Sequence, residues 1–164
     1  MDREEILEEI NKTKEHLANM EKMLEDCESE RWKPEPSEEY YCVDDGNDVR
    51  RVNFNTMNAY DRDRIKAYNC FKTREQAEQE AEKILVRRQL EDIARRLNKG
   101  QKIDWNSTSP RKYHLCIDKA DYIYTNVCYS VKYQGTVYCL DEKFKDIAIQ
   151  EIGEERLKSY LRSE

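Results

Sequence analysis

Oxygen-bearing side chains crowd one short segment of the chain. Asp44, Asp45, Asn47 and Asp48 surround Gly46, and carboxylate and amide oxygens are the ligands that calcium prefers. The segment lacks the spacing of a calcium-binding loop and its terminal Glu. Asp, Asn and Gly are also the residues that build tight turns. The pattern therefore predicts an ordinary turn, and we expect neither a metal nor another cofactor.

A thiol and an imidazole fall close together in the second half of the chain. Cys116 and His114 alternate along one expected strand, so their side chains point to the same face. Such a pair can form a cysteine nucleophile with its base. A structural histidine gives the same pattern, and no serine-hydrolase, metalloprotease or phosphate-loop motif accompanies it. We expect the six cysteines to be mostly reduced, small buried residues, and the protein to have no enzymatic activity.

Arginines mark the second half of a long expected helix. They come in two pairs, of which Arg88 and Arg95 are one heptad apart, near tyrosine-rich strands. Such a face can contact a partner or the phosphates of a nucleic acid. The other interpretation is that they form ion pairs with acidic residues of their own helix and of the N-terminal segment. The candidate contact residues are Arg87, Arg88, Arg95 and Arg96.

The N-terminal segment carries a heptad pattern. Between residues 3 and 28 the apolar positions alternate steps of four and three, and the stripe is narrow. A narrow stripe is typical of a coiled coil, which needs a partner because such a helix is marginal alone in water. We expect residues 1–31 to form a heptad helix that pairs with a second copy or packs on the body, the pair being parallel or antiparallel. The expected oligomerisation residues are Ile6, Ile10, Leu17, Met20 and Leu24.

The body, residues 32–164, contains a pattern of strands and helix that occurs twice, over 38–100 and 111–162. A capping box of Thr73 and Gln76 predicts the start of the first helix, and Asp141 is the expected cap of the second. One unit alone cannot bury its sheet. The sequence therefore predicts an α+β fold, in which an N-terminal coiled-coil helix precedes a six-strand antiparallel sheet built from two units and packed with helices on one side.

The expected element bounds follow from turn and helix-stop residues. We expect helices over 74–98, 142–152 and 154–161, the last two separated at Gly153, and a loop over 55–64. The expected strands cover 39–43, 48–54, 65–71, 113–117, 122–133 and 136–140.

The overall charge restricts the classes of partner. The net charge is -6, which disfavours sequence-independent binding to nucleic acid but permits binding to a basic partner, or serves solubility alone. No apolar run approaches the roughly 20 residues of a membrane span. Met1 to Glu5 is charged at once, so we expect no secretory signal and a cytoplasmic protein.

Four segments occur in an order that is more specific than any one of them: 32–34 (Trp-Lys-Pro), 39–41 (Glu-Tyr-Tyr), 69–77 and 149–161. In this order they resemble a family of small accessory proteins from phages and prophages of low-GC Gram-positive bacteria, over nearly all of 32–161. Many members of that family also begin with a short coiled coil. The chain departs from the family at Cys139, where an aromatic residue is usual, and at Lys145, where a small residue is usual.

The resemblance implies a context and no catalytic residues. It implies a phage genome, the cytoplasm of a bacterial host, and a gene that the virion itself does not need. We expect a non-enzymatic binding protein that inhibits a host defence factor, such as an anti-CRISPR protein that blocks the nucleic-acid site of a CRISPR effector nuclease. The alternatives are a nucleic-acid-binding or regulatory module, and a structural or assembly adaptor that acts through its coiled coil.

Overall fold

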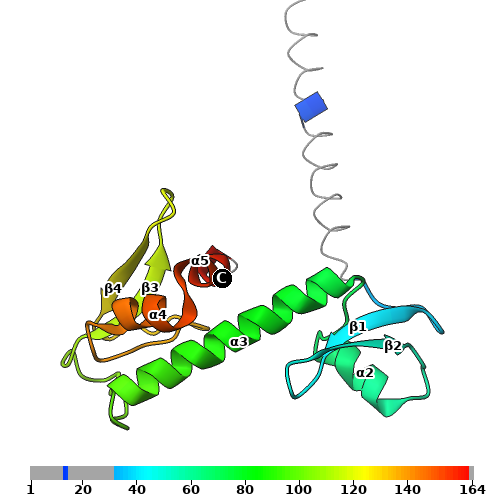
Figure 1. Ribbon diagram of the computed structural model, residues 1–164, viewed down its shortest axis with the longest axis horizontal. Coiled ribbons are helices and arrows are strands. Elements are labelled where there is room, and N and C mark those ends of the chain that lie inside the picture. The colour runs from blue at the N-terminus through cyan, green and yellow to red at the C-terminus, as the bar shows by residue number, and fades with distance from the viewer. Residues whose placement is uncertain (1–12, 15–31, 163–164) are drawn as a thin grey trace, which may run out of the picture. The chain divides into compact units, whose positions relative to one another are not determined.

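The computed structural model describes residues 13–14 and 32–162 (Figure 1). The described chain divides into two compact units, one of residues 32–40 and 52–72, the other of residues 41–51 and 73–162. Its elements follow in the order β1 (Glu39–Val43), β2 (Val49–Asn53), α2 (Ala59–Lys66), α3 (Arg74–Leu97), β3 (Lys112–Ile117), β4 (Ile123–Cys128), α4 (Phe144–Ile152) and α5 (Glu154–Arg162).

A buried carboxylate organises the first unit. Asp61 of α2 is fully buried and accepts hydrogen bonds from the Tyr40 hydroxyl at 2.7 Å and from the Asn55 backbone N–H at 3.0 Å. The Arg64 guanidinium lies 3.2 Å from the same carboxylate. Burial raises the pKa of Tyr40, so its hydroxyl stays protonated and donates. Asp61 is the buried residue of an otherwise polar helix, so hydrogen bonds rather than an apolar stripe hold α2 against the start of β1.

Helix α3 begins and ends where its sequence predicts. The Thr73 side chain accepts a hydrogen bond from the Gln76 backbone N–H, and the Gln76 side chain accepts one from the Thr73 backbone N–H. This is the capping box that the sequence predicted. At the other end Asn98 is the C-cap, and Gly100 adopts a φ of 76°, a conformation that favours glycine.

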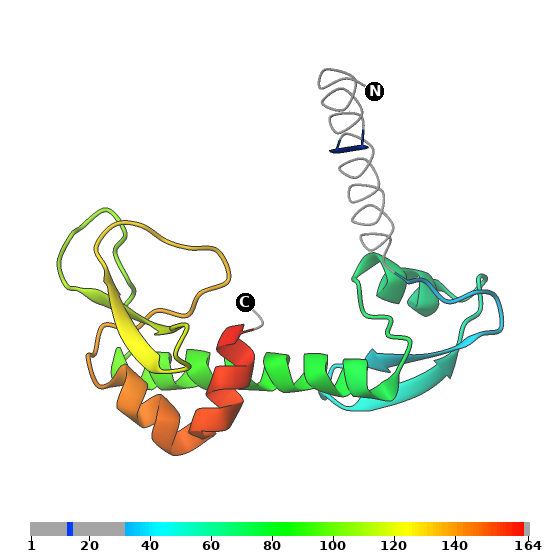
Figure 2. The same ribbon diagram turned by 90° about the horizontal axis from the view of Figure 1, so that it is seen from above.

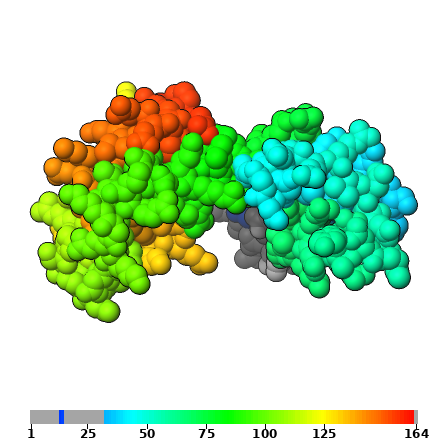
Figure 3. All heavy atoms as spheres, turned by 60° about the horizontal axis from the view of Figure 1, so that its bottom comes forward, coloured from blue at the N-terminus to red at the C-terminus, as the bar shows by residue number. Residues whose placement is uncertain are grey.

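One apolar core holds the second unit together. α4 and α5 both pack on α3, as Figures 2 and 3 show, and β3 contacts α4 and α5. Gly153, with a φ of 95°, separates α4 from α5, so each helix turns an apolar face to α3. The buried core consists of Val86, Leu90, Ile93, Ala94, Leu115, Cys139, Phe144, Ala148, Ile152, Leu157 and Tyr160.

The second unit contains a two-stranded antiparallel ribbon. β3 and β4 pair from Lys112 opposite Cys128 to Ile117 opposite Ile123. On its other side β3 forms an isolated bridge in which Tyr113 and Cys139 exchange two backbone hydrogen bonds of 2.7 and 2.9 Å. Leu115 faces the helical core, whereas Lys112, His114 and Cys128 share the opposite face.

The mixed α+β class is confirmed, but the single six-strand sheet is wrong. Within the described residues β1–β2 and β3–β4 form two separate two-stranded sheets. The expected strand 122–133 ends at Cys128, and the expected strand 136–140 is reduced to the bridge at Cys139. Bends at 129–130 and a turn at 134–135 interrupt the pairing, because period-two alternation alone does not supply a neighbouring strand.

Three further expectations need correction. Residues 55–64 are not all loop, and 65–71 is not a strand, because α2 runs from Ala59 to Lys66. Asp141 is not the cap of α4, which begins at Phe144 with Lys143 as N-cap; the Asp141 carboxylate instead accepts from the Lys143 N–H at 2.9 Å.

The expected heptad helix, with its boundary at residue 31, lies outside the described residues apart from Thr13 and Lys14.

A matched pair of leucine substitutions tests the core. Leu157 is fully buried between α3, α4 and α5, whereas Leu85 on α3 is 38% exposed. We expect Leu157→Ala to lower the free energy of unfolding by about 2–5 kcal/mol, because it leaves a cavity. Leu85→Ala should change it by about 0.5 kcal/mol or less. Urea unfolding measures both, and equal losses in the two variants would contradict this core.

Candidate functional site: the Trp105 groove

The polar face of the β3–β4 ribbon is covered by loops rather than by helices. The Lys112 ammonium group is fully buried there and donates hydrogen bonds to the carbonyl oxygens of Ser107 and Tyr129, the latter at 2.6 Å. A buried charge is costly unless its hydrogen bonds are satisfied. Lys112 therefore fixes two loops, one before β3 and one after β4, against the same strand.

Trp105 lies in the first of these loops and joins it to the second. Its ring meets the Tyr138 ring edge to face, with centroids 4.8 Å apart and an interplanar angle of 80°. The ammonium nitrogens of Lys112 and Lys132 lie 5.9 and 6.0 Å from the centroid of the Trp105 ring, within the range of a cation–π interaction. The Trp105 indole thus lies beside two cations, the buried Lys112 ammonium group and the exposed Lys132 ammonium group.

A groove of about 530 Å³ opens beside Trp105. One wall is the C-terminal part of α3, with Arg87, Glu91 and Arg95. The other wall combines Trp105 and Lys132 with the glycine-containing turn at 134–136. Three cationic side chains against one carboxylate give this Trp105 groove a positive charge. A basic wall facing an aromatic side chain suits a ligand that carries both phosphates and rings.

The Asn98 side-chain amide connects the C-terminal end of α3 to the segment that bridges β3. The Asn98 side-chain oxygen accepts a hydrogen bond from the Leu140 backbone N–H at 2.7 Å and lies 3.4 Å from the Cys139 sulfur. Asn98 is the C-cap of α3 and also lines the groove. Its amide therefore joins the helical wall to the segment that bridges β3.

The structure separates the four predicted arginines. Arg87 and Arg95 line the Trp105 groove, whereas Arg96 reaches Glu151 of α4 at 2.5 Å. Arg88 is exposed and does not line the groove. Arg96 is rotated by about 100° from Arg95 and points to α4, whereas Arg88 lies on nearly the same side of α3 as Arg95 but outside the groove lining.

The alternative interpretation, ion pairing within the fold, is confirmed for three of these arginines. Arg87 pairs with Glu91 at 3.1 Å, and Arg95 and Arg96 both contact Asp92. Arg95, and then Arg96, holds the pKa of Asp92 below its ordinary value. The pairs are exposed, and such pairs contribute only about 0–1 kcal/mol each. A phosphate can therefore replace the carboxylates at small cost.

The expected Cys–His pair is replaced by a different one. His114 and Cys116 do share a face of the ribbon, but the sulfur 3.5 Å from His114 Nδ1 belongs to Cys128 of the neighbouring strand. Both residues are buried, and the His114 ring lies beside the rings of Tyr133 and Tyr138. Burial lowers the pKa of His114, which favours the neutral imidazole. The arrangement is a packed interior rather than an accessible nucleophile.

The acidic segment forms the turn that its sequence predicts. Asp44 accepts a hydrogen bond from the Asp48 backbone N–H at 2.9 Å and pairs with Arg50 at 2.5 Å, and Asn47 adopts a φ of 71°. In the parts of the chain that the structure describes, no three metal-ligating side chains come together.

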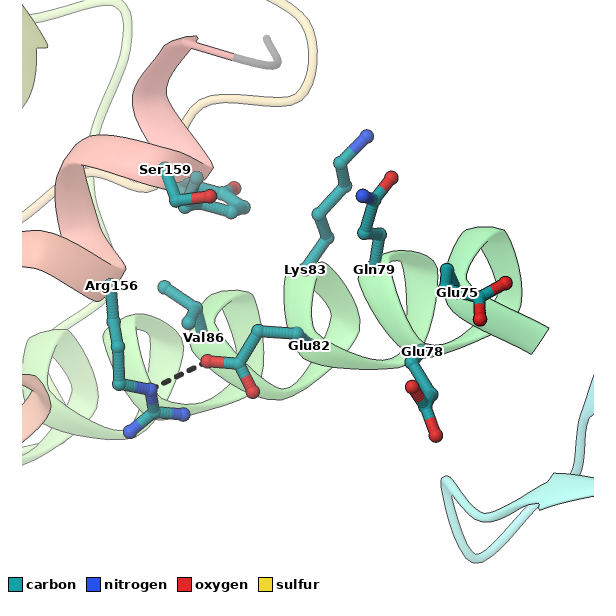
Figure 4. A pocket seen from close by; sticks show the side chains of 9 residues that line it. Glu75, Glu78, Gln79, Glu82, Lys83, Val86, Arg156 and Ser159 are labelled. Carbon is teal, nitrogen blue, oxygen red and sulfur yellow. Dashed lines mark hydrogen bonds and ion pairs between the residues drawn. The ribbon is translucent and has the colours of Figure 1, made fainter. Parts of the chain in front are cut away.

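A second hollow, of about 590 Å³, lies between α3 and α5 (Figure 4). Arg156 crosses its end to pair with Glu82 at 2.5 Å, while Gln79 and Lys83 rise from α3 toward the same side as Ser159. Its charges largely compensate one another. It offers no aromatic group comparable with Trp105 beyond the buried Tyr160.

Comparisons of the chain with protein-family models, with curated proteins and with solved structures find no match. Among the described helices none is both long and apolar enough to cross a membrane. The predicted oligomerisation residues, Ile6, Ile10, Leu17, Met20 and Leu24, lie outside the described residues.

Sequence reasoning singled out none of Trp105, Lys132 and Tyr138 as site residues. Lys132 follows β4 by four residues, and Tyr138 precedes the bridge at Cys139. No periodic pattern links these positions, because they belong to irregular segments. An isolated Trp in a polar loop was the one signal available, since a large aromatic residue in such a loop needs a partner to cover it.

The buried imidazole predicts a dependence of stability on pH. The pKa of His114 lies below its ordinary value of 6.5 because of burial. Below that value the unfolded chain binds a proton that the folded chain does not, so the stabilisation is complete above about pH 6.5 and is lost as the pH falls. In His114→Gln, urea unfolding should show a smaller loss between about pH 7.5 and 5.5 than in the parent chain. Identical losses would contradict a buried, neutral His114.

Proposed function

We propose that this protein is a non-enzymatic binding protein that holds single-stranded nucleic acid in the Trp105 groove. The observation that carries the proposal is the position of Trp105 and Lys132 opposite Arg87 and Arg95. Proteins that bind single strands combine a cationic groove for the backbone with an aromatic side chain on which a base stacks. The Trp105 groove supplies both parts within one unit of the fold.

The distribution of charge removes the main objection to this proposal. The net charge of -6 belongs to the whole chain, but residues 1–31 contain 11 Asp and Glu against 5 Lys and Arg. Residues 32–162 contain 24 Lys and Arg against 23 Asp and Glu. The part of the chain that carries the groove is therefore close to neutral overall, and a locally positive groove can attract phosphates.

A matched pair of arginine substitutions tests the groove. Arg95 lines it and Arg88 does not, although both are exposed arginines of α3. Arg95→Glu should weaken the binding of a fluorescently labelled oligothymidine severalfold and reduce the slope of log affinity against log salt by about 1. Arg88→Glu has the same effect on net charge and should leave affinity nearly unchanged. Fluorescence anisotropy at several salt concentrations measures both.

Two results would contradict the proposal. Equal weakening in both variants would show that only the overall charge matters. Absence of binding by the parent chain at low salt would exclude nucleic acid as the ligand of the groove.

A second candidate function is the inhibition of a host defence nuclease in a bacterial cytoplasm. The observation that favours it is the concentration of the whole net negative charge in residues 1–31. An acidic segment can compete with nucleic acid for a basic groove on another protein. The resemblance to phage accessory proteins agrees with such a role, and a CRISPR effector nuclease is the partner class that it implies.

Substitutions that neutralise glutamates in two parts of the chain test whether the N-terminal segment carries the inhibition. Changing Glu4, Glu5 and Glu8 to Gln should restore DNA cleavage by a nuclease that the parent chain inhibits, because the attraction to the basic site is reduced. The same change at Glu78, Glu142 and Glu155, which are exposed on the body, should leave inhibition intact. Inhibition that survives the first set, or is lost equally with the second, would contradict the role of the N-terminal segment.

A further inference from the structure

Strand β4 lies at an open edge of its sheet (Figure 1). Tyr113 of β3 exchanges its backbone hydrogen bonds with Cys139, so the alternation of an antiparallel ladder directs the backbone of its partner Val127 away from β3. The same alternation turns Ile123 and Thr125 outward. Within the described residues no other strand accepts or donates a hydrogen bond at these outward groups.

One outward group has a substitute partner. The Val127 backbone N–H is satisfied by the side-chain oxygen of the adjacent Asn126 at 2.9 Å. A side chain that occupies a ladder donor in this way can be replaced by the carbonyl of a further strand, since both are hydrogen-bond acceptors. The Val127 N–H therefore has an acceptor in the single chain, and a further strand can still pair with β4 by replacing that acceptor.

The composition of this edge differs from the rest of the chain. Residues 122–131 contain no charged residue, no Gly and no Pro, although 39% of the chain is charged. Natural edge strands are usually protected from pairing by charged residues, Pro or bulges. Strand β4 instead exposes Tyr124, and the residues that flank it expose Tyr122, Tyr129 and Val131.

We propose that β4 pairs antiparallel with β4 of a second copy of this chain, centred on Thr125. This register joins the outward backbone groups of both strands. It places Ile123 opposite Val127 and Thr125 opposite its own counterpart, which are apolar and Thr–Thr pairs of the kind that stabilise sheets. On the other face Tyr124 lies opposite Asn126.

The absence of charge makes the edge suited to pairing with its own copy. A two-fold axis repeats every side chain, so any charge near the centre meets a like charge, and like charges opposite each other are destabilising. The uncharged segment extends on both sides of Thr125 and ends at Asp121 and Lys132. The result is a four-stranded sheet, which is more stable in water than a two-stranded ribbon.

The test must separate this interface from the expected coiled coil of residues 3–28. The parent chain, Leu17→Lys, Thr125→Lys and the double variant are compared by sedimentation equilibrium, with Thr125→Val as the uncharged control. Leu17→Lys and Thr125→Val should remain at twice the chain mass of 19.8 kDa. The double variant should fall to 19.8 kDa. A parent chain that is monomeric, or a Leu17→Lys variant that is monomeric by itself, overturns the proposal.

Hydrogen exchange gives a reading that needs no substitution in β4 itself. The Asn126 amide is directed at β3 and is protected in a single chain. The Thr125 amide is directed outward, and we expect its exchange in Leu17→Lys to slow at least tenfold as the protein concentration rises through the dimer range. Thr125 exchange that stays as fast at high concentration as at low concentration overturns the proposal, even if a dimer is present.

Discussion

The fully buried ammonium group of Lys112 is the interaction on which the loop-covered face of the β3–β4 ribbon depends. It contacts the carbonyl oxygens of Ser107 and Tyr129 and lies beside the Trp105 ring. Loss of these acceptors would leave an uncompensated charge inside the protein, which costs far more than an unmade hydrogen bond at the surface. The two loops are therefore held in one arrangement, although neither contains regular secondary structure.

This anchoring explains why the β3–β4 ribbon can have two different faces. The face with Leu115 is covered by α3, α4 and α5, an ordinary apolar core. The other face carries His114 and Cys128 and is covered by the rings of Tyr133 and Tyr138. Aromatic rings bury the polar groups while leaving one side of Trp105 accessible, so the same packing that stabilises the ribbon also creates the wall of the groove.

Local signals predicted the ends of elements better than they predicted their partners. The Thr73–Gln76 capping box, the break at Gly153 and the turn at Asp44 depend on residues a few positions apart, and all three are present. Helix α2 was missed because its buried residue is a carboxylate, and its partner Tyr40 lies 21 residues away. Apolar periodicity carries no information about such a contact.

The candidate site shows the same limit. Arg87 and Arg95 were found because they recur on a helix, but the pattern also included Arg96, which the rotation of α3 directs to Glu151, and Arg88, which does not line the groove. Trp105 and Lys132 are 27 positions apart in irregular segments, and only the fold brings the ammonium group to within 6.0 Å of the ring centroid. The site is made from loops that the buried Lys112 holds in place, and no local sequence pattern marks such a site.

The groove and the open edge of β4 are consequences of one small sheet. A ribbon of two strands is marginal by itself, so its stability comes from the core on one face and the anchored loops on the other. Any partner that binds only the folded ribbon stabilises it further. A strand added at β4 and a ligand held beside Trp105 both select the folded ribbon, so each favours the binding of the other wherever the unfolded ribbon is appreciably populated. The two proposals therefore carry a joint expectation: where the unfolded ribbon is populated, self-association and ligand binding are linked through the stability of β3 and β4, without any contact between the two surfaces.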